Sequence, residues 1–492
     1  MKNSFDRKSK DEGRRTKDEG RGTRDELISL PNYQLTNLLA YIIMKKILIL
    51  GSGLIAKPII QYLLSKNYQV SVASNTTERS DAMIGGHING QSVFWDATDE
   101  VALDAMVAAH DITVSILPYI FHVMVAKHCV AHRKNMVTTS YIKPEMQALD
   151  AAAKDAGIII LNEIGLDPGI DHMSAMRIID NVHKKEGAIL EFYSICGALP
   201  APEAAGNPFR YKFSWSPKGV VLAGNNDALF LHDGKIVEVP TRDLFKNPFK
   251  VNFPEVGALE VYPNRDSLAY REIYGIPEAK TMFRGTFRYQ GWCETLDALK
   301  ALNLISPEKF DMTGMTYSDM ATHQISGTRN LEPGTFNKRE VAEFLGISDD
   351  AHAIQAMEWL GLFDNKPMNR TLDSTFEVTS DLMIEKMSLG EMERDMVVLQ
   401  HTFLAAYSDG RKEVIRSRML DFGSLTTDTS IARTVALPAA IGVEMILAGK
   451  INITGVHIPV IPEIYNPVLD QLENMDIKMV EEYELPLSEM IR

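Results

Sequence analysis

The stretch GLDPGIDH (165–172) sets two carboxylic acids four positions apart among glycine and proline. Such a pair can belong to a metal-binding loop, to acid–base chemistry or to the turn before a helix. A calcium or magnesium loop needs more oxygen ligands at close spacing, and the following MSAMRII supplies none. Asp171 precedes an amphipathic run and is expected to cap a helix, with Pro168 fixing the turn ahead of it. Asp167 follows the apolar run GIIILNE, so we expect it at the sheet edge where ligands bind.

A phosphate-binding turn is the second chemical signal. GSGLIA (51–56) forms the pattern G-x-G-x-x-A between an apolar β run and an amphipathic run. The first glycine permits a tight turn, the second lets backbone N–H groups approach a pyrophosphate, and Ala56 lets the helix pack closely on the sheet. The pattern predicts a bound dinucleotide, and the alternative is a tight turn without a ligand.

The residues after the second β run bear on the choice between NAD and NADP. An acid there would bind the ribose 2′-hydroxyl of NAD, whereas this chain has SNTT (74–77) with Arg79 nearby. No carboxylate would repel a 2′-phosphate and Arg79 could pair with one, so NADP is favoured over NAD by a small margin. The alternative places Arg79 on a solvated helix face.

These residues need a parallel sheet to bring them together. Apolar β runs at 45–50, 69–74, 112–118, 136–140 and 157–163 alternate with helical stretches such as 119–133 and 144–156. This alternation predicts an α/β fold with a doubly wound Rossmann sheet.

From about residue 188 the pattern changes. AILEFYSICG, YKFSWS, GKIVEV and GTFRYQG are rich in β-branched and aromatic residues, which predicts a mixed or antiparallel sheet. Residues 305–395 are predicted to be helical, and 396–422 to form a hairpin that turns on Asp409-Gly410. A last helix is expected at about 431–448, ending at Gly449.

A length of 492 residues requires more than one core. We expect a Rossmann nucleotide-binding domain over 44–165 and a mixed-sheet α+β substrate domain over 166–304 and 396–430. A small helical insertion over 305–395 would interrupt the second domain, and 431–492 would return toward the first domains as a helix and tail. Residues 1–43, with the tandem repeats KDEGRRT and KDEGRGT, are expected to be a disordered tail or to precede a natural start at Met44.

The composition argues against several classes of protein. The formal charge of −14 argues against a general nucleic-acid binder. The apolar run LLAYIIM is broken by Lys45-Lys46 and is too short to span a membrane. Three cysteines in so long a chain indicate reduced thiols in the cytoplasm rather than a disulfide framework.

A metal site is not expected. His128 and His132 lie four apart on a predicted helix with Cys129 between them, which could form one edge of such a site. No third ligand follows at a zinc spacing. His172 is expected to bond a backbone carbonyl rather than to take part in catalysis.

The chain resembles the saccharopine dehydrogenase family of the glutamate-forming type, also called saccharopine reductases. The motifs ILGSGLIAKP, VSILPYIFH, VTTSYIKPEM, NEIGLDPGIDHM, YPNRDS and RGTFRYQG follow in family order from Met44 onward. LDPGIDH and NPxxYKFSWS are far more specific than a Rossmann fingerprint. The resemblance implies a homodimeric, NAD(P)-dependent enzyme that interconverts saccharopine with L-glutamate and 2-aminoadipate 6-semialdehyde in lysine metabolism.

The resemblance also implies roles for individual residues. Saccharopine is a secondary amine with three carboxylates, and Arg265 and Arg288 match family positions that bind substrate carboxylates. Asp167 matches the contact to a substrate amine, and Asp167 and Cys196 are the ionisable groups placed near the reacting bond. Positioning is the expected main role of both, with proton transfer open to Asp167. Further implied substrate contacts are Ser140, Tyr141, Thr286 and Phe287. Implied cofactor contacts are Gly51, Ser52, Gly53, Leu54, Ile55, Ser74, Asn75, Thr76, Trp95, Asp96, Leu117, Gly165, Leu166, Asp167 and Trp215.

Without the resemblance these residues have ordinary interpretations. Cys196 would be a small buried apolar residue, the aromatic residues would belong to the core, and the arginines would form surface ion pairs. Fungal members tend to place an arginine where Asn75 stands, which is the one departure that bears on the cofactor. Two other functions compete: a reductase that forms another secondary amine such as carboxyspermidine, and a non-catalytic dinucleotide-binding sensor. The second would have no reason to keep LDPGIDH, SYIKP and both arginines.

Overall fold

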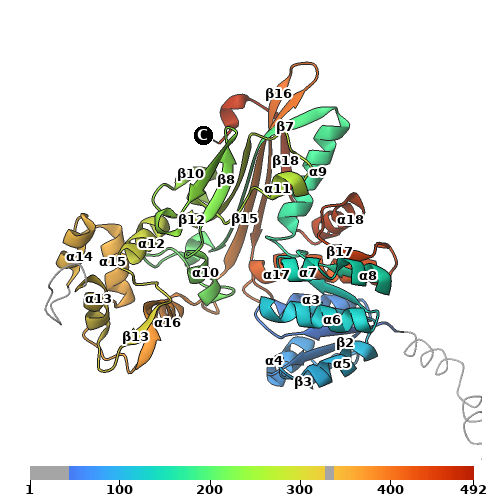
Figure 1. The fold of residues 1–492 in the computed structure, drawn as a ribbon, viewed down its shortest axis with the longest axis horizontal. Helices are drawn as coiled ribbons and strands as arrows, with labels where there is room; N and C mark the ends of the chain where they lie inside the picture. Colours follow the sequence, from blue (N-terminus) through green and yellow to red (C-terminus); the bar gives the residue numbers. More distant parts are fainter. Residues whose placement is uncertain (1–43, 327–336, 492) are drawn as a thin grey trace, which may run out of the picture. The chain divides into compact units, whose positions relative to one another are not determined.

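A computed structural model describes residues 44–326 and 337–491, so the predicted tail 1–43 lies outside the described residues. Seven parallel strands form the first sheet, in the order β17-β6-β5-β4-β1-β2-β3 (Figure 1). These are β1 (Lys46–Leu50), β2 (Gln69–Ser74), β3 (Gly90–Phe94), β4 (Ile112–Ser115), β5 (Asn135–Thr138), β6 (Ile159–Leu161) and β17 (Gly455–His457). The strand order reverses at β1, where a doubly wound sheet opens its ligand crevice. The predicted Rossmann sheet is confirmed, although neither β3 nor β17 was among the predicted strands.

Helices cover both faces of this sheet. They are α3 (Ala56–Ser65), α4 (Thr77–Ile84), α5 (Glu100–Ala109), α6 (His122–Ala131), α7 (Pro144–Gln147), α8 (Asp150–Ala156) and, from the end of the chain, α17 (Ser430–Leu447). Ile47 and Ile49 enter one hydrophobic core while Leu48 and Leu50 enter another. A strand buried on both faces is apolar throughout, which explains the unbroken KILIL.

The second sheet has nine strands, in the order β10-β11-β12-β7-β15-β16-β18, with β8 joined to β12 and β9 to β8. They are β7 (Gly187–Pro200), β8 (Ala228–His232), β9 (Lys235–Val239), β10 (Phe249–Phe253), β11 (Gly257–Pro263), β12 (Thr281–Tyr289), β15 (Asp395–Tyr407), β16 (Lys412–Phe422) and β18 (Val480–Leu485). β7 and β12 pair in parallel, and the β15–β16 hairpin pairs antiparallel. The mixed sheet and the hairpin were both predicted.

One predicted strand is wrong. YKFSWS (211–216) is irregular and contributes only an isolated bridge between Phe213 and Ser388. Tyr211 and Phe213 instead pack into the second hydrophobic core from a loop. Packing has overridden the β propensity of these aromatic residues.

The insertion between the strands of the second sheet is mainly helical. It contains α13 (Tyr317–Ser326), α14 (Lys338–Leu345), α15 (His352–Leu360) and α16 (Thr375–Met387), and it follows α12 (Trp292–Ala301). A two-stranded sheet of β13 (Lys309–Asp311) and β14 (Leu372–Ser374) lies within it. Figure 1 shows these elements together at the end of the second sheet.

The last segment of the chain differs from the prediction of a single closing helix. α17 ends at Leu447, two residues before Gly449, and α18 (Pro462–Glu473) follows β17. Pro467 inside α18 disguises its helical pattern in the sequence. Within the described residues, α17 alone is long and apolar enough to cross a membrane, but most of it is buried inside the fold, against α3 and β15.

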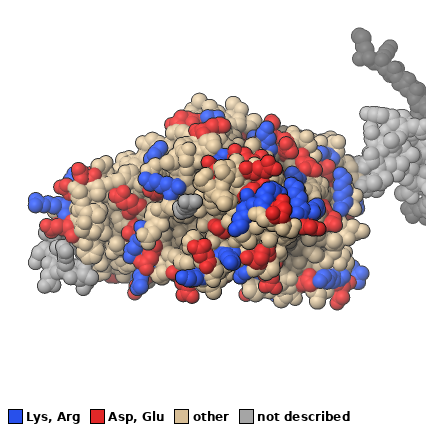
Figure 2. All heavy atoms as spheres, turned by 90° about the horizontal axis from the view of Figure 1, so that it is seen from above, with Lys and Arg blue, Asp and Glu red and all other residues tan. Residues whose placement is uncertain are grey.

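Charge is mixed over the surface that Figure 2 shows. Lysine and arginine side chains lie interspersed with aspartate and glutamate on this face of the molecule. Such a mixture differs from the single-sign basic stripe that a nucleic-acid binder presents.

Candidate active site

The GLDPG turn joins β6 to α9 (Ile170–Lys184). Gly169 has a φ of 146°, and a Cβ there would lie 2.1 Å from the carbonyl oxygen of Gly165, so only glycine fits. The N–H of Gly165 donates to the carbonyl of Pro168, and the N–H of Ile170 donates to that of Gly165. A cis peptide bond joins Asp167 to Pro168. The turn therefore holds Asp167 at the carboxyl edge of the parallel sheet.

Asp167 connects the two sheets. Its Oδ1 accepts a hydrogen bond from the hydroxyl of Tyr141, at 2.7 Å, and another from the guanidinium of Arg284 on β12, at 2.6 Å. Arg284 also approaches the Tyr141 hydroxyl at 3.2 Å. The second oxygen, Oδ2, has no hydrogen-bond partner in the described part of the chain and the side chain is 16% exposed, so it can meet a ligand.

The expected cap by Asp171 is wrong. α9 begins at Ile170 after Gly169, without a side-chain cap, and Asp171 lies inside its first turn. Its Oδ1 accepts from the N–H of Gly169 at 2.6 Å, and its Oδ2 accepts from Arg284 at 2.7 Å. The sequence interpretation separated the two acids, whereas one nitrogen of Arg284 binds both.

A second buried pair lies beneath this group. The imidazole of His172 lies 2.8 Å from a carboxylate oxygen of Glu163 and 2.6 Å from the hydroxyl of Tyr274, so the expected bond to a backbone carbonyl is wrong. Glu163 also accepts from the N–H of Ile142. Burial opposes protonation of His172, but the charge of Asp171 and the bond to Glu163 raise its pKa above the usual value. The pair thus joins Glu163, which precedes the GLDPG turn, to the helix after it.

The electrostatics of the group fix the protonation states of Tyr141 and Arg284. Burial raises the pKa of Tyr141 far above its usual value, so its hydroxyl remains a donor to Asp167. Burial alone would lower the pKa of Arg284, but Tyr141, Asp167 and Asp171 outweigh burial and raise the pKa well above its usual value. Tyr141 is therefore unsuited to act as a base.

Arg288 lies on the same face of β12 but in a different setting. It is 4% exposed, and its guanidinium lies over the rings of Tyr211 and Trp292, at 5.0 and 5.3 Å. One nitrogen donates to the carbonyl of Phe287, while Nε has no partner among the described residues. No carboxylate of the described chain forms an ion pair with it. A buried cation of this kind can receive an anionic ligand.

Other predicted substrate contacts are distributed unevenly. Arg265 is exposed and lies over the ring of Tyr141 at 5.6 Å. Thr286 pairs with Cys196 across β12 and β7. The side chain of Phe287 instead lies in the second core, with its backbone facing Gly197.

Cys196 lies among the charged residues but is unsuited to proton transfer. Its side chain is buried, and burial together with the charges of Asp167 and Asp171 raises the pKa of the thiol well above its usual value. The thiol therefore stays protonated near neutral pH. This leaves packing and positioning as its possible roles.

Ser140 is held by a buried histidine. The imidazole of His122 lies 2.8 Å from the hydroxyl of Ser140 and 2.8 Å from that of Ser115. Burial lowers the pKa of His122 to about 4, so the ring is neutral at physiological pH. The ring therefore fixes the hydroxyl of Ser140 at the end of β5.

The nucleotide turn has the features that a dinucleotide needs. Gly51 has a φ of 110°, and a Cβ at Gly53 would meet no atom within 4 Å, so open space faces this glycine. The N–H groups of Ser52 through Ile55 have no acceptor within 44–326 and 337–491. Such free N–H groups before a helix suit a pyrophosphate.

The remaining predicted cofactor contacts mostly line the carboxyl edge of the parallel sheet. Ser74 is buried and bonds Thr76, whereas Asn75 is exposed. The Trp95 ring is buried, and Asp96 is exposed with its pKa lowered by hydrogen bonds from Thr98. The further predicted contacts Leu54, Leu117, Gly165 and Leu166 follow β1, β4 and β6. Trp215 is the exception, because it follows no strand of this sheet and lies half-buried against two cores.

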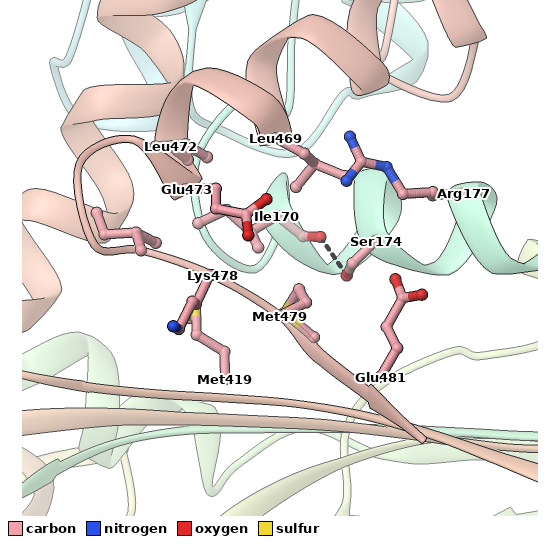
Figure 3. A pocket seen from close by; sticks show the side chains of 11 residues that line it. Ile170, Ser174, Arg177, Met419, Leu469, Leu472, Glu473, Lys478, Met479 and Glu481 are labelled. Atoms are coloured by element: carbon pink, nitrogen blue, oxygen red, sulfur yellow. Dashed lines mark hydrogen bonds between the residues drawn. The ribbon is translucent and has the colours of Figure 1, made fainter. Parts of the chain in front are cut away.

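Two other features lie apart from this site. His128 and His132 both lie within hydrogen-bonding distance of Asp104, at 2.9 and 2.7 Å, and no group of three or more potential metal ligands occurs in the described part of the chain. A pocket lined by Ile170, Ser174 and Arg177 of α9 faces α18 and the residues before β18 (Figure 3). None of the predicted site residues lines it.

Sequence reasoning missed Arg284, Glu163 and Tyr274 as members of the site. Arg284 opens RGTFRYQG, four residues before Arg288, and this spacing puts both side chains on one face of a strand. That signal was available for Arg284. None marked Tyr274, which lies far along the chain from His172.

Comparisons with known proteins agree with this architecture. Residues 47–161 match the saccharopine dehydrogenase NADP binding domain, and residues 165–477 match the saccharopine dehydrogenase C-terminal domain. Saccharopine dehydrogenase [NADP(+), L-glutamate-forming] of Schizosaccharomyces pombe is 38% identical over 456 residues, which cover 89% of this chain and 99% of that protein. The mitochondrial alpha-aminoadipic semialdehyde synthase of Bos taurus is 36% identical, but the match covers only 47% of it.

A solved structure gives the same result. Apo saccharopine dehydrogenase (L-Glu forming) from Saccharomyces cerevisiae is 35% identical, covers 89% of this chain and superposes with a TM-score of 0.81. The match includes 99% of that chain, so it extends over both sheets. This chain therefore belongs to the saccharopine dehydrogenase family.

Proposed function

We propose that the chain is an NADP-dependent saccharopine dehydrogenase of the glutamate-forming type. Saccharopine, water and NADP⁺ would give L-glutamate, 2-aminoadipate 6-semialdehyde, NADPH and a proton, and the reverse reaction would form saccharopine. The observation that carries the proposal is the meeting of Asp167 and Tyr141, at the carboxyl edge of the sheet that also carries the nucleotide turn, with Arg284 of the second sheet. It supports a site where dinucleotide and substrate lie together.

The residues divide the substrate between them by charge. Oδ2 of Asp167 is free to bind the substrate amine, and the buried, anion-free Arg288 is suited to a substrate carboxylate. Arg265 is a second cation beside Tyr141 for another carboxylate. A carboxylate-poor polyamine product would leave Arg288 buried without a partner, which favours saccharopine over carboxyspermidine.

The nicotinamide, when bound, supplies hydride transfer to or from the carbon of the C–N bond. The N–H groups of Ser52 through Ile55 would hold the pyrophosphate. Asp167 would orient the amine and accept its proton as the imine forms, while Tyr141 and Arg284 fix the carboxylate. Ser140, held by His122, would orient a polar group of the substrate.

NADP is the proposed cofactor for two reasons. The matched nucleotide domain is described as NADP binding, and no carboxylate follows β2 to repel a 2′-phosphate. Arg79 is exposed on α4 and has no ion-pair partner in the described residues, so it is available to the phosphate. We also propose a cytoplasmic homodimer, on the family resemblance and on three free, buried cysteines. Light scattering of the purified protein tests the dimer.

Turnover tests the proposal directly. The protein is mixed with saccharopine and either NADP or NAD, and absorbance of the reduced nicotinamide is followed at neutral to alkaline pH. We expect turnover when saccharopine and the cofactor are both present, and a higher kcat/KM with NADP than with NAD. A matched control is Gly53→Val, which meets open space in the fold and should retain the fold but block the pyrophosphate. No turnover by the wild-type chain with either cofactor would refute the proposal.

A further inference from the structure

Asp171 is too deeply buried to meet substrate, yet it belongs to the charged group at the site. Its side chain is 1% exposed, whereas that of Asp167 is 16% exposed. The N–H of Gly169 donates to one of its oxygens and the guanidinium of Arg284 to the other, which also lies 3.6 Å from the imidazole of His172. The first turn of α9 further favours a carboxylate there.

The charges of this group determine what Asp167 can offer a ligand. With Arg284 positive and both aspartates negative, the trio carries a net charge of −1. Without Asp171, Arg284 and Asp167 would form a neutral pair. An ammonium group binds a net negative centre far better than a neutral ion pair, because the nearby guanidinium would repel it.

We propose that Asp171 is a positioning residue for the substrate amine, acting through Arg284. By neutralising Arg284, it leaves the charge of Asp167 available to the ammonium while the same guanidinium fixes the Asp167 rotamer. This inference rests on the proposed function, because it assumes an amine-bearing substrate. If Asp171 had a merely structural role, its replacement would instead weaken the binding of all ligands alike.

Two ligands that differ only in the amine separate these readings. L-Glutamate and glutarate carry the same two carboxylates, and only glutamate carries an ammonium group. Their inhibition constants are measured against saccharopine, with the full-length protein and NADP. In Asp171→Asn we expect glutamate to bind roughly ten- to hundredfold more weakly, the range of a lost charge-assisted hydrogen bond, with glutarate little changed.

A rescue variant tests the charge argument itself. Asp171→Asn combined with Arg284→Gln removes one charge of each sign and leaves Asp167 alone with its charge of −1. The double variant should recover most of the preference for glutamate over glutarate that the single variant loses. If the single variant does not fold, the double variant decides alone: a retained preference supports the proposal and a lost preference overturns it.

Asp470→Asn is the matched control, because Asp470 of α18 is itself mostly exposed and pairs with Arg177 of α9. It should leave both inhibition constants unchanged. Equal weakening of glutamate and glutarate in Asp171→Asn, or no weakening of either, would overturn the role of Asp171 while saccharopine turnover by the wild type stands. Absence of that turnover would instead refute the proposed function.

Discussion

Arg284 and Arg288 lie four residues apart on one strand, and both are nearly fully buried. Arg284 is bonded to two carboxylates and the hydroxyl of Tyr141. Arg288 lies among aromatic rings, with a backbone carbonyl as its hydrogen-bond acceptor and no ion pair in the described chain. The difference shows how two equally buried cations serve different purposes. The charge of Arg284 is balanced by carboxylates of the fold, whereas no carboxylate of the described residues pairs with Arg288, which is why we propose it for a substrate carboxylate.

The largest expected effect is on stability, from Arg284→Met. It removes the guanidinium partner of Asp171 and leaves this buried carboxylate with only the imidazole of His172, 3.6 Å away, and breaking a buried pair in this way costs about 3–5 kcal/mol. Urea unfolding of the two methionine variants gives the measurement. Arg288→Met should cost no more than about 1–2 kcal/mol, since it strands no carboxylate and loses contacts with rings and one hydrogen bond to the carbonyl of Phe287. Equal losses of stability in both variants would remove the distinction between the arginines.

The next effect is on substrate binding, from Arg288→Met. We expect the KM for saccharopine to rise roughly ten- to hundredfold because a charged hydrogen-bond donor to a carboxylate is lost. The KM for NADP should stay constant in the same steady-state assay. Arg394→Met is the control, because this partly exposed arginine also lies over a ring, that of Phe422. An unchanged KM for saccharopine in Arg288→Met would contradict the assignment.

The pH dependence of stability tests the environment of His172, which lies beside the group around Arg284 and not beside Arg288. The pKa of His172 is raised in the folded state above its usual 6.5, so the folded protein binds this proton more tightly than the unfolded chain. The resulting stabilisation is complete below pH 6.5 and is lost as pH rises through the folded-state pKa. His172→Gln should abolish this part, about 1–2 kcal/mol. Urea unfolding on both sides of this range should show the wild-type advantage shrinking at high pH, and a constant or growing advantage would contradict it.

The smallest effect is expected from Tyr141→Phe. It removes one hydrogen bond to Asp167, worth about 0.5–1.5 kcal/mol, so kcat/KM should fall by roughly three- to tenfold. Tyr270→Phe is the control because its ring lies over Arg284 at 4.3 Å and its hydroxyl makes no hydrogen bond with the described residues. A loss as large in Tyr270→Phe as in Tyr141→Phe would show that the hydroxyl of Tyr141 is not what matters.

Much of the fold could be predicted from local sequence. Short apolar runs and GSGLIA were sufficient for β1, β2, β4, β5 and β6 of the parallel sheet, and the strand ends placed Asp167 at its carboxyl edge. The strand predicted at YKFSWS was wrong because its aromatic residues lie in a loop and pack into the second core, where packing outweighs β propensity. α18 was missed because Pro467 lies inside it.

The charged centre could not be predicted in the same way. Arg284 contacts acids that precede it by 113 and 117 residues, and nothing local marks such a partner. Asp171 has the spacing of a helix cap, yet the turn at Gly169 makes the helix begin at Ile170. The carboxylate of Asp171 therefore lies inside the first turn and reaches Arg284 instead. Side-chain pairing across two sheets depends on their docking, which sequence periodicity does not encode.

The path of the C-terminal segment bears on how the chain is made. Gly455–His457 completes the edge of the parallel sheet beside β6, and Val480–Leu485 completes the mixed sheet beside β16. Each of these edge strands is synthesised after all the other strands of its sheet. Until then each sheet exposes an unpaired edge that could join a neighbouring chain. The partly made protein is therefore open to such edge-to-edge pairing until residues 455–485 have been synthesised.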